Sequence, residues 1–113
     1  PSVDSFADGT AVAQIGAHGF EICRHYVDEV ITVSNDELCS AIKLIYDDTR
    51  SITEPSGALA VAGIRRYVTR TGAQGQTLVA INSGANINFD SLRHVAERVA
   101  AREHRLNVEV AEL

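Results

Sequence analysis

The sequence predicts an α/β fold in which helices cover a partial layer of short buried strands. Segments with apolar residues at helical spacing alternate with short apolar or β-branched runs, which is the pattern of an α/β layer. The clearest strand is QTLVAIN at residues 76–82, a continuous apolar run of the kind that is covered on both faces in a parallel sheet. Only one other strand, Val30–Val33, is convincing before residue 105. Two strands are too few for a doubly wound sheet, so we interpret the chain as a fragment of a larger fold.

The first half of the chain carries recognisable helix signals. Apolar residues at loosely helical spacing predict a helix over residues 20–27, and the strand Val30–Val33 follows it. Ser34 then stands at an N-cap position, and Glu37 completes a capping box. A second helix is therefore expected from Ser34 to about Asp48.

Proline and glycine mark the third helix. Pro55 occupies a first helical position, where a missing amide hydrogen is tolerated, and Gly72 follows the last turn, where a positive φ ends a helix. After the strand at residues 76–82, apolar residues repeat at helical spacing over residues 92–100. A fourth helix is expected there, with Asn88 or Asp90 as its cap.

Charge and length exclude several classes of function. The chain has 113 residues and a formal net charge of −5, with acidic and basic residues interspersed, so neither a nucleic-acid nor a membrane surface is predicted. No apolar run approaches the roughly 20 residues that span a bilayer, and no signal leader opens the chain. We therefore expect a soluble cytoplasmic protein that binds small molecules or other proteins. Cys23 and Cys39 lack metal or disulfide spacing and are expected as reduced thiols.

No motif of an independent enzyme is present in the sequence. The four histidines are scattered without metal-ligand spacing, and neither a G-x-S-x-G elbow nor a G-x-G-x-x-G or Walker loop occurs. What remains is the turn after residues 76–82, where Ser83, Gly84 and Ala85 would let a flat ligand approach the backbone closely. A tight strand-to-helix connection, with serine and asparagine as capping residues, explains the same turn equally well.

Three motifs together resemble those of threonine deaminases. They are FADGTAV at residues 6–12, EPSGA at residues 54–58 and SGAN at residues 83–86, and the stretch DEVITVSNDELCSAI between the first two is also similar. Threonine deaminases are lyases of fold type II, the class of pyridoxal-phosphate enzymes built like the β subunit of tryptophan synthase. The resemblance covers nearly the whole chain. It implies that the α/β layer is a fragment of the large domain of that fold.

The SGAN motif and the tail of the chain favour one branch of that family. Serine racemase and the short catabolic deaminases tend to carry SGGN, whereas SGAN and the tail of this chain resemble the long biosynthetic form. The tail, residues 105–113, alternates apolar and polar residues and predicts a half-exposed strand. By resemblance, residues 1–104 belong to the catalytic domain. Residues 105–113 then begin the linker, or first strand, toward an ACT-like regulatory domain that senses isoleucine.

The resemblance also implies roles for individual residues. Ser83 is similar to the serine whose hydroxyl faces the pyridine nitrogen of pyridoxal 5′-phosphate, and Gly84 and Glu54 lie near the cofactor. A neutral hydroxyl can donate to that nitrogen without fully protonating it, which makes the ring a moderate electron sink. Asn86 is expected to fix the turn by side-chain hydrogen bonds. Asp8 matches a position that helps to hold a divalent cation in the racemase branch, although no partner ligand is recognisable upstream.

The catalytic machinery of the family is incomplete in this chain. The Schiff-base lysine and the glycine-rich phosphate loop are missing, and the only lysine, Lys43, lies within a predicted amphipathic helix. No catalytic residue is therefore expected here, and the chain alone should be inactive. We predict part of a homo-oligomeric threonine ammonia-lyase that converts L-threonine to 2-oxobutanoate and ammonia in isoleucine biosynthesis. The alternatives are a serine/threonine dehydratase or racemase of the same family, or a stand-alone, non-catalytic α/β binding or assembly module.

Overall fold

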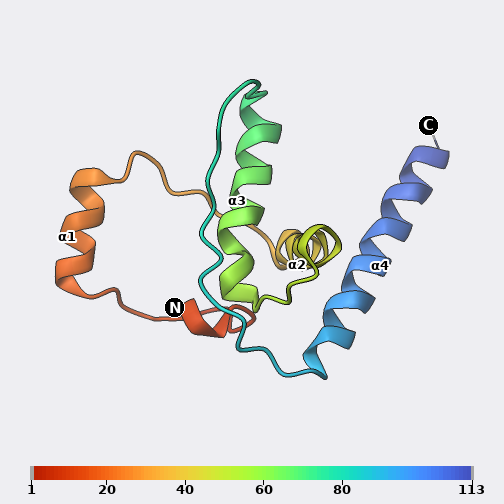
Figure 1. Cartoon of the computed structure of the whole chain (residues 1–113), viewed down its shortest axis with the longest axis horizontal. Coiled ribbons are helices and arrows are strands. Elements are labelled where there is room, and N and C mark those ends of the chain that lie inside the picture. The colour runs from red at the N-terminus through yellow and green to blue at the C-terminus, as the bar shows by residue number, and fades with distance from the viewer. Residues whose placement is uncertain (1, 113) are drawn as a thin grey trace.

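The structure of the chain, a computed structural model, describes residues 2–112, and every regular element in that range is a helix. These elements are a short 3-10 helix, η1 (Asp8–Thr10), followed by α1 (Ala17–Tyr26), α2 (Asn35–Thr49), α3 (Pro55–Thr71) and α4 (Ser91–Ala111). Helix α2 packs against both α3 and α4, and η1 packs against α3. Helix α1 stands apart and packs against no other helix of the described residues (Figure 1).

The core lies where α2 meets its two neighbours. Its buried residues are Leu38, Cys39, Ala41, Ile42 and Ile45 of α2, Ala58 and Ala62 of α3, and Val95 and Val99 of α4. Alanines on α3 allow its backbone to approach α2 closely, so the small side chains set how near the helices lie. Both cysteines are free thiols; the expected burial is found for Cys39, whereas Cys23 is exposed. Burial raises the pKa of the Cys39 thiol, which keeps it protonated and unreactive.

Local capping signals in the sequence are confirmed. Ser34 Oγ accepts a hydrogen bond from Glu37 N at 3.2 Å, and Ser34 N donates to Glu37 Oε2 at 2.6 Å, which is the predicted capping box. Pro55 is the first residue of α3, and Gly72 ends that helix with a φ of 66°. Asp90 stands at the N-cap of α4, but its side chain makes no capping hydrogen bond.

The predicted layer of buried strands is wrong for the described residues. Neither Val30–Val33 nor residues 76–82 forms a strand, and Val30 and Val79 are 83% and 82% exposed. A strand needs neighbouring backbone to pair its amide and carbonyl groups. No backbone hydrogen bond within residues 2–112 joins either segment to a neighbour, so the apolar pattern lacks the partners that would make it a sheet.

Both extended segments nevertheless lie along the same helix. Ile31 and Val33 from the first segment and Leu78 and Val79 from the second line one open groove of about 550 Å³ with the side of α3. The second segment runs back alongside α3 in the opposite direction (Figure 1). Two apolar segments therefore lie over one face of α3, as two strands of a sheet would. Within residues 2–112 they are not joined by backbone hydrogen bonds into a sheet.

Helix α4 replaces the strand predicted at residues 105–113, of which Leu113 lies outside the described residues. The helix continues to Ala111, and Arg105 Nη2 lies 3.2 Å from Asp36 Oδ2 at the start of α2. Neither glycine nor proline interrupts the segment, and a helix satisfies its backbone internally where a strand without a partner cannot. Within residues 2–112, no helix combines the length and the apolar character that crossing a bilayer requires.

The exposed apolar segments predict that the 113-residue chain alone associates with itself. Val30, Val79 and Ile81 are each more than three-quarters exposed, and contiguous apolar patches larger than roughly a few hundred Å² favour association. We expect sedimentation equilibrium at micromolar concentration to show dimers or larger species. A Val79→Lys variant, which places a charge on the patch, should shift the distribution toward monomer. A monodisperse monomer of the unmodified chain would contradict this expectation.

Candidate functional site

Two of the sequence motifs are in direct contact at the start of α3. Glu54 N donates a hydrogen bond to Gly84 O at 3.1 Å, so the residue before the helix is joined to the SGAN turn. Thr53 Oγ1 lies 2.8 Å from Gly84 O and 2.7 Å from Asn82 Oδ1. The EPSGA and SGAN motifs, far apart in the sequence, therefore form one site.

Thr53 is the centre of this contact. Its side chain is completely buried, and its hydroxyl carries one proton for the acceptors around it. If Thr53 Oγ1 donates this proton to Gly84 O, it can still accept a hydrogen bond. The Asn82 side-chain amide supplies one when its NH2 group, rather than its oxygen, faces Thr53 Oγ1. In that arrangement both contacts are ordinary hydrogen bonds, and the turn is tied to α3 by backbone and side chain together.

Glycine is required at position 57 for this approach, whereas at position 84 the neighbour is the end of a flexible side chain. A Cβ atom at Gly84 would overlap Glu54 Oε1, so the Glu54 carboxylate lies directly against the Gly84 backbone. A Cβ atom at Gly57 would overlap Gly84 O, Thr53 Oγ1 and Asn82 Oδ1. The first turn of α3 and the SGAN turn are thus packed at backbone distance, which only a hydrogen side chain permits.

The three residues predicted to bind the cofactor are brought together. Glu54 is half-buried at the N-cap of α3, but its side chain does not cap the helix and lies over Gly84 instead. Ser83 is the exposed residue next to Gly84, and its hydroxyl makes no hydrogen bond within residues 2–112. A ligand at this turn would therefore find a free hydroxyl and a carboxylate side by side.

The FADGTAV motif lies beside the other two motifs. A Cβ atom at Gly9 would lie 3.0 Å from Ser56 Oγ, and Asp8, Pro55 and Asn86 line one hollow of about 320 Å³. Ser56 Oγ is buried and has no hydrogen-bond partner in this part of the chain. An orphaned hydroxyl at the start of a helix is an unsatisfied polar group that a bound molecule could engage.

Asp8, predicted as a cation ligand, receives no support from its surroundings. Its carboxylate accepts a hydrogen bond from Gly9 N at 2.8 Å, and the side chain is exposed. Within residues 2–112, no group of three or more histidine, cysteine, aspartate or glutamate side chains is placed to hold a metal ion.

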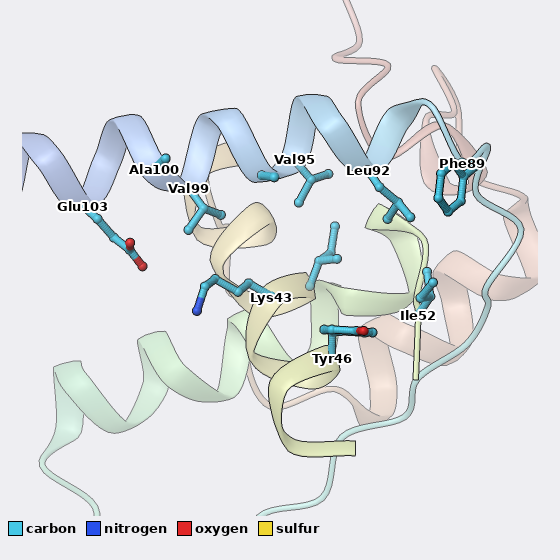
Figure 2. Close-up of a pocket in the computed structure, with 11 residues that line it drawn as sticks. Lys43, Tyr46, Ile52, Phe89, Leu92, Val95, Val99, Ala100 and Glu103 are labelled. Carbon is cyan, nitrogen blue, oxygen red and sulfur yellow. The ribbon is translucent and has the colours of Figure 1, made fainter. Parts of the chain in front are cut away.

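Lys43, the only lysine of the chain, lies elsewhere. It lines an apolar pocket of about 490 Å³ between α2 and α4, to which none of the three predicted cofactor residues contributes. Figure 2 shows Lys43 and Glu103 toward one end of this pocket and Phe89 at the other. Lys43 Nζ lies 2.7 Å from Asp47 Oδ2, and this hydrogen bond raises the pKa of the ammonium group. The amine therefore stays protonated, which makes it a poor nucleophile.

Sequence reasoning missed Thr53 and Asn82. The sequence suggested Asn86 as the residue that fixes the turn, but Asn86 makes no side-chain hydrogen bond within residues 2–112, and Asn82 makes one instead. Thr53 immediately precedes the EPSGA motif and Asn82 immediately precedes SGAN. The only available signal was this adjacency, because no general pattern marks a threonine for complete burial.

Comparison with protein families gives one match over most of the chain. The profile described as "Pyridoxal-phosphate dependent enzyme" matches residues 1–84, which include η1, α1, α2, α3 and the first two residues of SGAN. The matched region therefore contains Thr53, Glu54, Ser83 and Gly84.

Individual relatives share a single description. The chain is 56% identical to the biosynthetic L-threonine dehydratase of Burkholderia multivorans, over 91% of this chain and 20% of that protein. It is 46% identical to the Escherichia coli biosynthetic L-threonine dehydratase, over 93% of this chain and 20% of that protein. The mitochondrial threonine dehydratase of Saccharomyces cerevisiae is 50% identical over 91% of this chain and 19% of its own length. The chain thus spans about a fifth of the length of these relatives.

A solved structure is similar over the same region. The processed form of threonine deaminase isoform 2 from Solanum lycopersicum superposes with a TM-score of 0.86 and is 42% identical, covering 88% of this chain and 28% of that one. The helical arrangement of the described residues is therefore the arrangement that this stretch adopts inside a much longer protein.

The close packing of Gly57 predicts that Gly57→Ala weakens the site. The added methyl group would overlap the Gly84 carbonyl, the buried Thr53 hydroxyl and the Asn82 side chain, so the contact between α3 and the SGAN turn must open. We expect a loss of about 1–3 kcal/mol in the free energy of unfolding, measured by urea denaturation.

Gly63→Ala on the same helix is the matched control. A Cβ atom at Gly63 meets nothing within 4 Å, so this variant should be neutral or more stable by up to about 1 kcal/mol through helix propensity. Equal effects of the two substitutions would show that helix propensity, not the packing at Gly57, determines the result.

Proposed function

The chain belongs to the family of pyridoxal-phosphate dependent enzymes, and we propose that it is part of the catalytic domain of a biosynthetic threonine dehydratase. The whole protein, in this proposal, converts L-threonine to 2-oxobutanoate and ammonia, a reaction that leads toward isoleucine. The observation that carries the proposal is the direct contact of EPSGA with SGAN through Thr53, Glu54 and Gly84. The similarity to several threonine dehydratases supports the choice of substrate.

The residues at this contact fit one side of the cofactor. Ser83 offers an exposed hydroxyl that no neighbour among residues 2–112 engages, and the backbone of the adjacent Gly84 is held against Thr53 and Glu54. Glu54 holds a carboxylate beside them that is not used for helix capping. When bound, pyridoxal phosphate supplies an electron sink for bonds at the α-carbon of an amino acid.

Ser83 is the residue proposed to act on the cofactor ring. Its neutral hydroxyl would donate a hydrogen bond to the pyridine nitrogen and hold the proton mainly on its own oxygen. Glu54, fixed against Gly84 by packing and by its backbone hydrogen bond, would orient the turn that presents Ser83. A pyridine nitrogen that accepts a hydrogen bond without being protonated makes the ring a weaker electron acceptor. A weaker acceptor suits loss of the β-hydroxyl group of the substrate.

The remaining catalytic groups must come from outside this stretch. Lys43 is held as an ammonium ion by Asp47 and lies in a different pocket from the Ser83 turn, so it does not serve as the covalent cofactor lysine. We therefore place that lysine and the phosphate-binding loop in the rest of the parent protein. The parent is further proposed to be a cytoplasmic homo-oligomer, with an isoleucine-sensing regulatory domain reached through a linker that begins near residue 105, within the last turns of α4.

The proposal is tested with the complete parent protein and with the 113-residue chain. With added pyridoxal phosphate and L-threonine, the parent should release 2-oxobutanoate, which lactate dehydrogenase and NADH detect continuously. The chain alone should release no more than a heat-denatured control, because it lacks the covalent lysine. A parent protein that leaves threonine unchanged would contradict the lyase assignment and favour a non-catalytic binding module.

Ser83→Ala in the parent tests the role of the hydroxyl. Removing one hydrogen bond worth about 0.5–1.5 kcal/mol should lower kcat about two- to tenfold while the fold is kept. The absorption band of the bound cofactor should shift as well, because the pyridine nitrogen loses its donor. Ser51→Ala, an exposed serine whose hydroxyl makes no hydrogen bond within residues 2–112, is the control and should leave both unchanged. Normal turnover of Ser83→Ala, together with an unshifted cofactor absorption band, would contradict the proposed contact between Ser83 and the cofactor.

A further inference from the structure

A second polar hollow lies between α2, α3 and α4, away from the candidate cofactor site. We name it the arginine hollow; it is lined by Glu37, Ala62, Arg65, Arg66, Thr69, Arg70 and Arg102. Its volume is about 440 Å³, within the range of pockets that hold small molecules. None of Thr53, Glu54, Ser83 or Gly84 lines it, so it is independent of the proposed lyase site.

The charge of the arginine hollow is opposite to that of the chain. The whole chain has a net charge of −5, yet four arginines and only one carboxylate, that of Glu37, line this hollow. Arg70 is neutralised by an ion pair with Glu29, and Arg66 lies 3.2 Å from Glu37 Oε2. Arg65 and Arg102 form no ion pair within residues 2–112. Arg65 therefore has no carboxylate partner within this range, whereas the charge of Arg102 lies close enough to Asp36 and Glu37 to lower the pKa of both carboxyl groups.

Arg66 and Arg102 are held in place by neighbouring side chains, whereas the Arg65 side chain makes no hydrogen bond within residues 2–112. Arg102 Nη1 donates to Ser40 Oγ at 3.1 Å, and the Ser40 hydroxyl in turn donates to Asp36 O at 2.9 Å. Glu37 is fixed by the capping box, where the hydrogen bond from Ser34 N lowers the pKa of its carboxyl group. Glu37 thus stays charged and fixes Arg66 beside it. A set of oriented donors loses little entropy when an anion binds.

We propose that the arginine hollow binds a compact polyanion that carries two or more phosphate or carboxylate groups. Guanidinium groups present paired N–H donors that match these oxyanions in a bidentate geometry. Arg65 and Arg102 supply guanidinium groups that form no ion pair within residues 2–112 from two different helices, so one ligand would bridge α3 and α4. Ala62 at the base is almost completely buried and small, which leaves depth for a ligand between the longer side chains.

The experiment uses the complete parent protein loaded with pyridoxal phosphate, so that the cofactor site is already filled. Isothermal titration with sodium tripolyphosphate and, separately, with citrate distinguishes phosphate from carboxylate ligands. We expect saturable binding of at least one of them that weakens with added salt. Arg65→Gln and Arg102→Gln should each reduce the affinity about tenfold, because each removes charge-assisted hydrogen bonds.

Arg93→Gln is the matched control. Arg93 lies on α4 outside the arginine hollow and the substitution changes the net charge equally, so the affinity should change less than about twofold. Arg65→Gln is the decisive variant if Arg102→Gln fails to fold, since the Arg65 side chain makes no hydrogen bond within residues 2–112. Absence of binding for both probes up to about 10 mM, or equal weakening by Arg93→Gln and Arg65→Gln, would overturn the proposal.

Discussion

The buried hydroxyl of Thr53 is the contact on which the candidate site depends. It donates to Gly84 O, lies 2.7 Å from the Asn82 side-chain amide and is completely shielded from water, so this hydrogen bond is worth more than an exposed one. Through this contact, the turn after an exposed extended segment acquires a fixed position relative to α3. Since α3 packs on α2, and α2 on α4, the geometry of the SGAN turn follows from the helical core rather than from the loop itself.

Features encoded by neighbouring residues could be predicted from the sequence, and features that need distant partners could not. The Ser34 capping box and the ends of α3 at Pro55 and Gly72 depend on a few adjacent residues, and the structure has them as expected. The strands at Val30–Val33 and residues 76–82 depend on pairing, and no pairing partner lies within residues 2–112. The prediction that these segments are buried strands is wrong for residues 2–112, where Val30, Val79 and Ile81 are exposed.

The residues of the candidate site also fall into those that the sequence indicated and those that only the structure shows. Glu54, Ser83 and Gly84 came from resemblance to a known family, and the structure brings them to one place. Thr53 had no signal, because its importance arises only when Asn82 and the Gly84 carbonyl are brought to it by folding. The requirement for glycine at position 57 is likewise invisible in sequence, since it follows from the Gly84 carbonyl and the Thr53 hydroxyl that lie against it.

Helix α3 connects the two proposed sites and limits how they can influence each other. Its N-terminal turn is packed against the SGAN turn at Gly57, whereas Arg65, Arg66 and Arg70 in its C-terminal half line the arginine hollow. The helix has 17 residues and spans about 25 Å. A shift of α3 along its axis would break the Thr53 contact and disturb the close packing at Gly57, so these contacts oppose such a shift. An anion in the arginine hollow would therefore stabilise the existing arrangement of α3 and α4 by binding it, without moving the Ser83 turn.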